Sequence, residues 1–404
     1  MAAKVAVVTT DMQDGRNDNL PTLQLLLFEL EQDRERKDAA GQSRSRTNTV
    51  GLYDIAPRFV FYPGKVGESI IDRTESKGDP IQREFEYKGR AFRLTLKPAV
   101  IPRRARTEDG AEDRGQVEYW DHVFPGEREQ IVEHVVRRLA TERGRLALDA
   151  KDQLTMRFSL YEIQKELERV KRTLSIVEIR EALTILHQSF VEIRGKGKGG
   201  SVLLSSTAFP ALGLRGRGTD SLSGAATETY LTLNPMVAES IRSMSFRMMS
   251  YGWLMRLKNP VSRWLFNRLT VEFEDAEAPA PAVINARAIV RDSGMNEWSR
   301  PRDTLRAVRE AVLALQNEGI LEAVDVEKIM SGRRLDDENY TMTPSQQFLH
   351  EIEAASALAE RNQQHVAALD PSSEGHGDFI RISRPVAADL RRKRRAENAL
   401  LAVK

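Results

Sequence analysis

The sequence of 404 residues contains no cysteine, which excludes disulfide bonds, zinc sites built on thiolates and thiol nucleophiles. It also has no apolar run close to the roughly 18 residues that a membrane-spanning helix needs, and its N-terminus lacks a signal-peptide core. Positive and negative charges nearly cancel at a net +2, so the total charge indicates no class of partner. We therefore expect a cytoplasmic protein that makes no contact with a membrane.

Residues of the common catalytic and cofactor sites form no recognisable set. The six histidines are scattered, without the HExxH or His-x-His spacing that holds a metal. No Walker A sequence is present. The one Gly-x-Gly-x-x-Gly match, at 195–200, is followed by a predicted strand, whereas a dinucleotide site needs a helix N-terminus there. We therefore expect no catalytic residue, no metal and no cofactor, and we expect that the protein is not an enzyme.

Two helix starts lie close together in the middle of the chain. Ser159 is followed three residues later by Glu162, and Ser175 three residues later by Glu178, and each pair is a capping box. Apolar residues after each serine recur at helical spacing, which predicts two amphipathic helices. After the second helix the period changes to two, around a Gly- and Lys-rich tip at 195–200. A close helix pair followed by a hairpin with a basic tip predicts a winged helix.

A second unit of the same kind is predicted further along the chain. It begins at Asn234. Within it, Asn259–Pro260 is a cap followed by proline at the first helical position, and a later helix ends at Gly319. The predicted elements are a helix from Pro260, a helix at 283–291, a helix at 299–317, a strand at 320–324, a charged turn at 331–338 and a strand at 340–342.

The predicted fold class is α+β, with tandem winged-helix domains preceded by a β-hairpin region and a flexible N-terminal tail. Residues 84–96 alternate around a Gly turn as a hairpin does, and 103–116 are interpreted as a charged loop. Tyr119 and Trp120 are expected in the core, and the polar stretch 33–49 is expected to be a linker or a disordered stretch. The expected parts are a flexible segment at 1–49, a hairpin region at 50–117, winged helices at 118–233 and 234–345, and a helix, linker and basic tail at 346–404.

Both predicted recognition helices carry residue types that contact DNA. Arg and Gln pair bidentately with guanine and adenine edges, and Thr reaches phosphate or a thymine methyl group. In the second helix the arginines recur four and three residues apart, so they form one row with few nearby acids, which favours phosphate binding. A solvated face remains the alternative for both helices, and Glu181 favours it for the first. The candidate DNA-binding residues, including two lysines at the wing tip, are Arg172, Thr173, Arg180, Thr184, His187, Gln188, Lys196, Lys198, Arg300, Arg302, Arg306 and Arg309.

The stretches Leu154–Ile163, Glu181–Leu186 and Asn259–Leu269, in that order, resemble the plasmid replication initiator (Rep) proteins, and most closely the broad-host-range initiators of the TrfA type. The resemblance covers roughly 85–345. It implies binding to double-stranded origin repeats (iterons), local melting, and recruitment of host replication proteins including the replicative helicase machinery. A homodimer is left open. The sequence departs from the family by a Gly/Ser loop at 213–227 and a basic tail after 377.

A short apolar island, Gln24–Phe28, lies within polar sequence. Two interpretations remain open: a helix packed on the body, or a peptide that docks on a partner. Gln-Leu-Leu-Leu-Phe resembles the clamp-binding peptide of bacterial replication proteins, and TrfA-type initiators carry one ahead of their winged domains. The resemblance therefore implies that Gln24, Leu25, Leu27 and Phe28 bind the host sliding clamp.

The predicted function is initiation of plasmid replication by sequence-specific DNA binding. A winged-helix transcriptional regulator is the first alternative, and a mobile-element enzyme whose site is not recognisable is a more distant one. Two winged-helix domains on one chain, which we call the two heads, favour an extended, asymmetric DNA site. This favours the initiator over the regulator.

Overall fold

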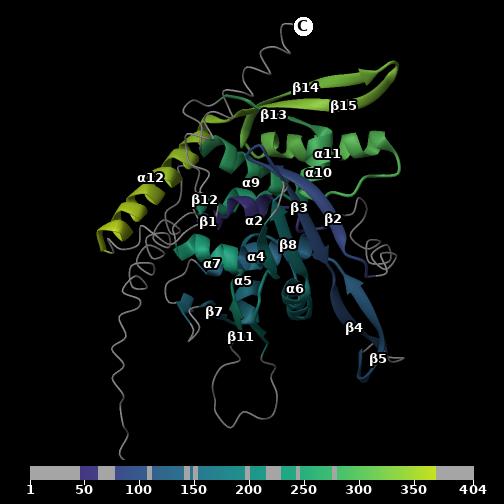
Figure 1. Cartoon of the computed structure of the whole chain (residues 1–404), viewed down its shortest axis with the longest axis vertical. Helices are drawn as coiled ribbons and strands as arrows, with labels where there is room; N and C mark the ends of the chain where they lie inside the picture. The colour runs from purple at the N-terminus through teal and green to yellow at the C-terminus, as the bar shows by residue number, and fades with distance from the viewer. Residues whose placement is uncertain are drawn as a thin grey trace, which may run out of the picture.

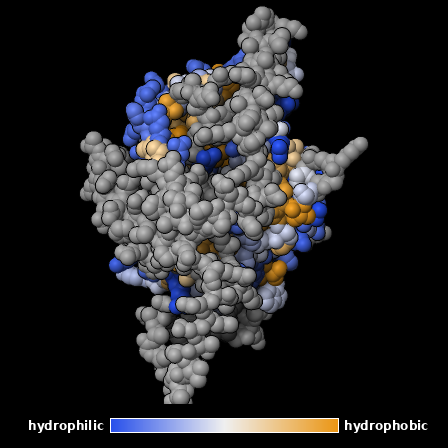
Figure 2. Space-filling view, turned by 60° about the vertical axis from the view of Figure 1, so that its left-hand side comes forward, coloured by the Kyte–Doolittle hydropathy of each residue, from blue (hydrophilic) through white to orange (hydrophobic). Residues whose placement is uncertain are grey.

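The computed structural model describes residues 46–61, 78–106, 112–140, 146–148, 153–195, 201–214, 229–242, 246–274 and 280–369. Within them the chain has the expected α+β class, with helices and small antiparallel sheets (Figure 1). Figure 2 shows small hydrophobic patches between hydrophilic ones on the described part of one face. No described helix is both long and apolar enough to span a bilayer.

Both helix starts predicted from the capping boxes are confirmed. The Ser159 hydroxyl accepts from the Glu162 amide at 3.2 Å, and the Glu162 carboxylate accepts from the Ser159 amide at 2.7 Å. Ser175 and Glu178 repeat the pair at 3.2 Å and 2.7 Å. The two helices pack on each other and on an earlier helix, α4. The elements of this first unit are α4 (Glu127–Leu139), β6 (Leu146–Leu148), β7 (Leu154–Phe158), α5 (Leu160–Arg169), α6 (Ile176–Gln188), β8 (Phe190–Gly195) and β9 (Val202–Thr207).

The predicted hairpin after α6 is confirmed, and its sheet extends beyond the hairpin itself. β8 pairs with β9 on one side and with β3 (Arg90–Lys97) on the other, so the order is β2 (Ile81–Tyr87), β3, β8, β9. The predicted hairpin around residues 84–96 is β2–β3, and its buried Phe92 and Leu94 extend the core of the first unit.

Strand β7 lies in a different sheet from the hairpin that follows α6. It pairs with β6 and with β11 (Thr229–Thr232), which in turn pairs with β10 (Leu212–Gly213). In the first unit, β2–β3 therefore takes the place beside β8 that a strand preceding the helix pair would take in a simple winged helix.

A second hairpin stands where a charged loop was predicted. β4 (Ala99–Arg106) pairs with β5 (Glu112–Val123). Ile101 and its partner Asp121 are buried against α6, so the neighbouring pair Pro102–Trp120 faces away. Tyr119 and Trp120 are 52% and 60% exposed, so their expected place in the core was wrong. The prediction failed because only one face of this hairpin is covered.

The polar stretch predicted to be a linker up to residue 49 ends in a buried strand. β1 (Arg46–Thr49) pairs with β12 (Arg247–Ser250), and α2 (Gly51–Ile55) follows it. Polar groups are buried here because they bond one another. The Asp54 carboxylate accepts from the Thr49 hydroxyl at 3.0 Å and from Arg137 of α4 at 2.5 Å. Arg58 adds bonds to Asp54 at 3.3 Å and to Glu133 of α4 at 3.0 Å.

The second unit has the same order of elements, with a strand and a turn placed differently from the prediction. The region 283–291, predicted as one helix, contains a strand and then a helix, and the strand pairs with the following hairpin to make one three-stranded sheet. Residues 331–338 are not one turn, because Gly332 (φ 61°) completes a tight turn and β15 starts at Arg334. The elements are α9 (Pro260–Glu274), β13 (Ala282–Asn285), α10 (Ala286–Ser293), α11 (Pro301–Asn317), β14 (Leu321–Ser331) and β15 (Arg334–Pro344).

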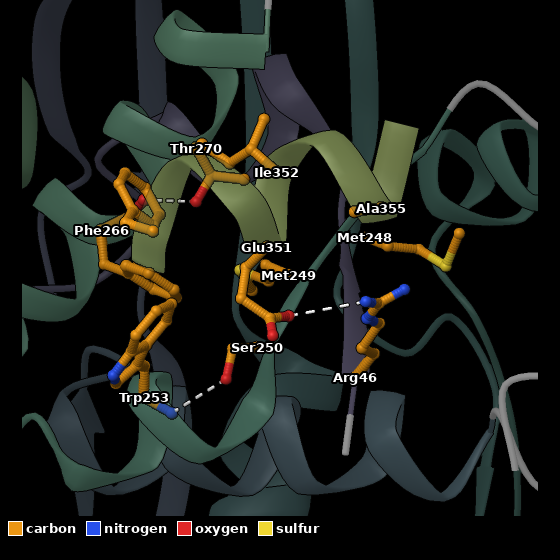
Figure 3. A pocket seen from close by; sticks show the side chains of 11 residues that line it. Arg46, Met248, Met249, Ser250, Trp253, Phe266, Thr270, Glu351, Ile352 and Ala355 are labelled. Carbon is orange, nitrogen blue, oxygen red and sulfur yellow. Dashed lines mark hydrogen bonds and ion pairs between the residues drawn. The ribbon is translucent and has the colours of Figure 1, made fainter. Parts of the chain in front are cut away.

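Three further helices complete the described chain: α7 (Pro235–Arg242), α8 (Tyr251–Arg256) and α12 (Gln346–Leu369). The start of α12 packs Phe348 against Trp253 of α8 and Phe266 of α9. A cavity of about 10 Å³ lies beside these rings, next to an ion pair of 3.5 Å between Arg46 and Glu351 (Figure 3). That volume is about the space of one water molecule, so this cavity is too small for a cofactor.

Candidate nucleic-acid interface

The exposed side of α6 presents Arg180 to solvent near the start of the helix. Its guanidinium has no partner in the described part of the chain. Val177, one turn earlier, is 66% exposed, and Thr173 in the preceding turn is also exposed. A free arginine beside an apolar side chain can contact a base edge and a thymine methyl group.

Glu181, which favoured a solvated face in the sequence, is neutralised by two arginines. Arg103 of β4 binds its carboxylate at 3.2 Å and Arg128 of α4 binds it at 3.0 Å. Burial raises the pKa of Glu181, but Arg128 and Arg103 outweigh this and hold the pKa below its ordinary value. Glu181 therefore holds the β4–β5 hairpin and α4 against α6, and its charge is compensated when a phosphate approaches.

Four other candidates of the first unit make bonds within the protein. Arg172 donates to the backbone carbonyls of Leu257 at 3.0 Å and Met255 at 3.4 Å. The remaining three lie on α6. The His187 ring nitrogen Nδ1 lies 2.6 Å from the Phe209 backbone carbonyl. The side-chain oxygen Oε1 of Gln188 accepts from the Val100 amide at 3.1 Å, and the Thr184 hydroxyl donates to the Arg180 backbone carbonyl at 2.9 Å. These bonds position α6, and they leave Arg180 and Thr173 as the exposed candidates whose side chains make no bond to a described residue.

The arginine row on α11 divides into two side chains without a described ionic partner and two compensated ones. Arg300 and Arg302 are exposed, and no described acid pairs with either. Arg306 lies 3.2 Å from Asp303 and 4.0 Å from Glu310. Thus the expectation of few compensating acids holds for only half of the row.

Arg309 is the strongest exception in that row. Its guanidinium forms a two-point ion pair with the buried carboxylate of Glu338 on β15, with Nε at 3.1 Å from Oε2. The Tyr340 hydroxyl donates to the same carboxylate at 2.7 Å. The hydrogen bonds and charge of Glu338 raise the pKa of Arg309. Arg309 therefore ties α11 to its hairpin.

The two units are joined through a buried arginine. Arg263 of α9 is fully buried and binds Glu127 and Gln130 of α4, each at 2.9 Å. It also donates to the Leu257 carbonyl at 2.7 Å. Burial lowers the pKa of Arg263 to about 10, although Glu127 opposes the shift. Trp264 extends the contact by donating to the Ile55 carbonyl at 3.0 Å.

Some candidate residues lie outside the described residues: Lys196 and Lys198 at the tip between β8 and β9, and Gln24, Leu25, Leu27 and Phe28. Among the residues that are described, no group of three or more acids or histidines is placed to hold a metal. Sequence reasoning missed the exposed Trp120 and the exposed Lys171, which has a positive φ of 59°. Trp120 gave no signal, because an aromatic residue in a strand is more often buried.

No protein-family model matches the sequence, and a search of the curated proteins finds no match. Among solved structures, one of RctB domains 2–3 covers 76% of this chain and 99% of its own, with 8% identity and a TM-score of 0.40. A selenomethionine derivative of RctB domains 2 and 3 covers 66% and 91%, with 9% identity and a TM-score of 0.38. The Pi initiator protein in complex with iteron DNA covers 54% and 93%, with 11% identity and a TM-score of 0.36. Scores of this size do not establish a common fold.

Proposed function

We propose that this chain is a replication initiator that binds repeated sequences in origin DNA through two winged-helix heads, without catalysing a reaction. One observation carries the proposal: each unit has a helix with at least one exposed arginine that has no described partner, and a β-hairpin follows that helix. Arg180 occupies this place on α6, and Arg300 and Arg302 occupy it at the start of α11. An α-helix fits the major groove, where arginine pairs bidentately with guanine.

The arrangement of the second unit supports its assignment as a winged helix. Helix, strand, two helices and a hairpin follow in that order, and β13 pairs with β15 to close a three-stranded sheet. The first unit has the same helix pair and hairpin, and β3 supplies the strand beside β8. We accordingly propose that the hairpin at 81–97 belongs to the first head.

The connection between the heads favours the initiator over a regulator. Arg263 and its partners on α4 hold the two units together through buried bonds, so both heads engage DNA in one fixed arrangement. Such a pair recognises an extended site without two-fold symmetry, as in a direct repeat. The resemblance to TrfA-type initiators agrees with this interpretation.

Footprinting on the DNA that flanks the gene tests the proposal. The expected result is protection of a row of direct repeats beside an A·T-rich stretch. Protection of one palindrome overlapping a promoter would instead indicate a transcriptional regulator, and absence of any specific protection would contradict both functions.

We further propose that Gln24–Phe28 docks on the host sliding clamp, and that host replication proteins including the helicase machinery are recruited to the same DNA. The Gln24 amide both donates and accepts, so it suits a polar slot, while Leu27 and Phe28 each contribute roughly 1.5–3 kcal/mol when buried. Calorimetric titration with purified clamp should detect binding by the wild type and loss of binding in Leu27→Ala/Phe28→Ala. Binding that survives the double substitution would exclude this peptide.

A further inference from the structure

The turn between α5 and α6 meets the end of α8 and the residues that follow it at one place on the surface. Arg172 of the turn donates to the carbonyls of Met255 and Leu257. In the same segment, Arg256 pairs at 2.8 Å with Glu318, the residue that caps the end of α11. The start of α6 and the end of α11 therefore converge here. We call this place the joint surface, and its exposed lysines are Lys171 and Lys258.

Lys171 has an unfavourable backbone conformation for a residue with a side chain. Its φ is 59°, and Lys88 is the only other described non-glycine residue with a positive φ. The position directly follows the end of α5, where glycine normally takes the left-handed conformation. A left-handed residue that has a Cβ costs roughly 1–2 kcal/mol. Backbone strain of this kind is found at functional positions, which makes Lys171 a candidate for one.

The charges around Lys171 and Lys258 leave both ammonium groups available. Neither lysine forms an ion pair with a described residue. Glu168, on the last turn of α5, is exposed and does not come within ion-pair distance of Lys171. Of the neighbouring arginines, Arg256 is compensated by Glu318, and Arg169 by Glu166 at 2.6 Å. The joint surface therefore holds uncompensated positive charge between the two heads.

We propose that Lys171 and Lys258 bind the phosphate backbone of the duplex segment that runs between the parts contacted by α6 and α11, an inference that rests on the proposed function. With 17 residues, α11 is about 25 Å long, and its exposed arginines lie at the end opposite the joint surface. Neighbouring major-groove segments on one face of a duplex are about 34 Å apart. When each head occupies one of them, the backbone between them passes the joint surface.

Lys171→Gly tests the proposal with little risk to the fold, because glycine accepts a positive φ without strain. Lys88→Gly replaces the other described lysine with a positive φ (49°), in the turn between β2 and β3, and controls for the effect of such a substitution on stability in urea unfolding. Each variant is titrated by fluorescence anisotropy with origin DNA and with random duplex DNA over a series of salt concentrations.

The plot of log affinity against log salt concentration has a negative slope, and each phosphate contact contributes about −0.9 to it because the contact releases counterions. Lys171→Gly and Lys258→Ala should therefore each make the slope less steep by about 0.9, and the double variant should make it less steep by about 1.8. The affinities for origin and random DNA should fall by the same factor, because a phosphate contact does not depend on the base sequence. An unchanged slope in the double variant would overturn the joint-surface contact while leaving the initiator proposal intact. If the salt slope changes in Lys258→Ala but not in Lys171→Gly, Lys171 does not take part in the phosphate contact. A wild type that binds no duplex would overturn the proposed function and this inference together.

Discussion

Arg180 is the residue of α6 from which we expect sequence discrimination, because it is exposed and its guanidinium has no described partner. Arg180→Ala should weaken binding to the cognate repeat by roughly 1–3 kcal/mol and binding to random DNA by much less. Competition titrations with both DNAs measure the difference. Equal losses would place Arg180 on phosphate, and no loss would leave it on a solvated face.

Arg309 and Arg302 lie in the same row of α11 but should behave differently. Arg309→Ala leaves the buried Glu338 carboxylate without its ionic partner, so the free energy of unfolding should fall by about 1–3 kcal/mol. Arg302→Ala removes an exposed side chain that has no ionic partner among the described residues, and it should change stability by no more than about 0.5 kcal/mol. Urea unfolding of both variants, followed by salt titration of DNA binding, separates the two roles. A stable Arg309→Ala protein would contradict this assignment.

At the residue scale, the sequence could identify side chains off the apolar stripe of each helix, but it could not identify their partners. Periodicity placed Gln188 and Arg309 away from the core correctly. Their actual contacts, the Val100 amide and the Glu338 carboxylate, are 88 and 29 residues away in the sequence. The exposed arginines that remain as candidates can be distinguished only once those long-range bonds are known.

The helices and strands that could be predicted from the sequence are those whose signals lie within a few neighbouring residues. The starts of α5 and α6 were predicted because a capping box is contained within four residues. The β4–β5 hairpin was missed because its strands are charged and covered on one face only, and β13 was missed because it is a four-residue strand joined directly to α10. Strand pairing depends on distant residues, so composition alone gave no reliable signal.

Helix α4 contains a histidine that should make stability depend on pH. His134 is buried, and burial, assisted by the charge of Arg137, lowers its pKa to about 3. Because this lies below the unfolded value of about 6.5, between these pH values the unfolded chain holds a proton that the folded chain lacks. The free energy of unfolding should therefore fall as the pH decreases below about 6.5, by up to about 1.4 kcal/mol per pH unit from this residue.

Urea unfolding at a series of pH values tests this dependence. His134→Gln should remove its part of the slope between about pH 6 and 4. His350→Gln is the control, since His350 is exposed on α12. An identical pH slope in the wild type and His134→Gln would show that His134 is not held neutral in the folded protein.

At the scale of the whole molecule, the sequence predicted two similar units but not how they are connected. The hydrophobic core is continuous through both units and through the segment at 46–61. That segment was assigned partly to a linker because it is polar, and its burial depends on Asp54 meeting Arg137. The contact between the two units through Arg263 could not be predicted from the sequence either, because the partners of Arg263 on α4 are more than 130 residues earlier in the chain.

Because the buried contacts of Arg263 fix the two heads relative to each other, DNA binding should depend on the helical spacing between the two halves of the DNA site. An inserted base pair turns the distal half of a DNA site by about 35°, so insertion of about five pairs puts that half on the opposite side of the duplex. Insertion of one full turn restores the side but moves the half about 34 Å further away. Heads on a flexible tether would regain binding at the full turn, whereas heads fixed by Arg263 should not. Gel-shift titration measures the affinity for each DNA site of such a spacer series, and the affinity at one full inserted turn shows whether the two heads are rigidly connected.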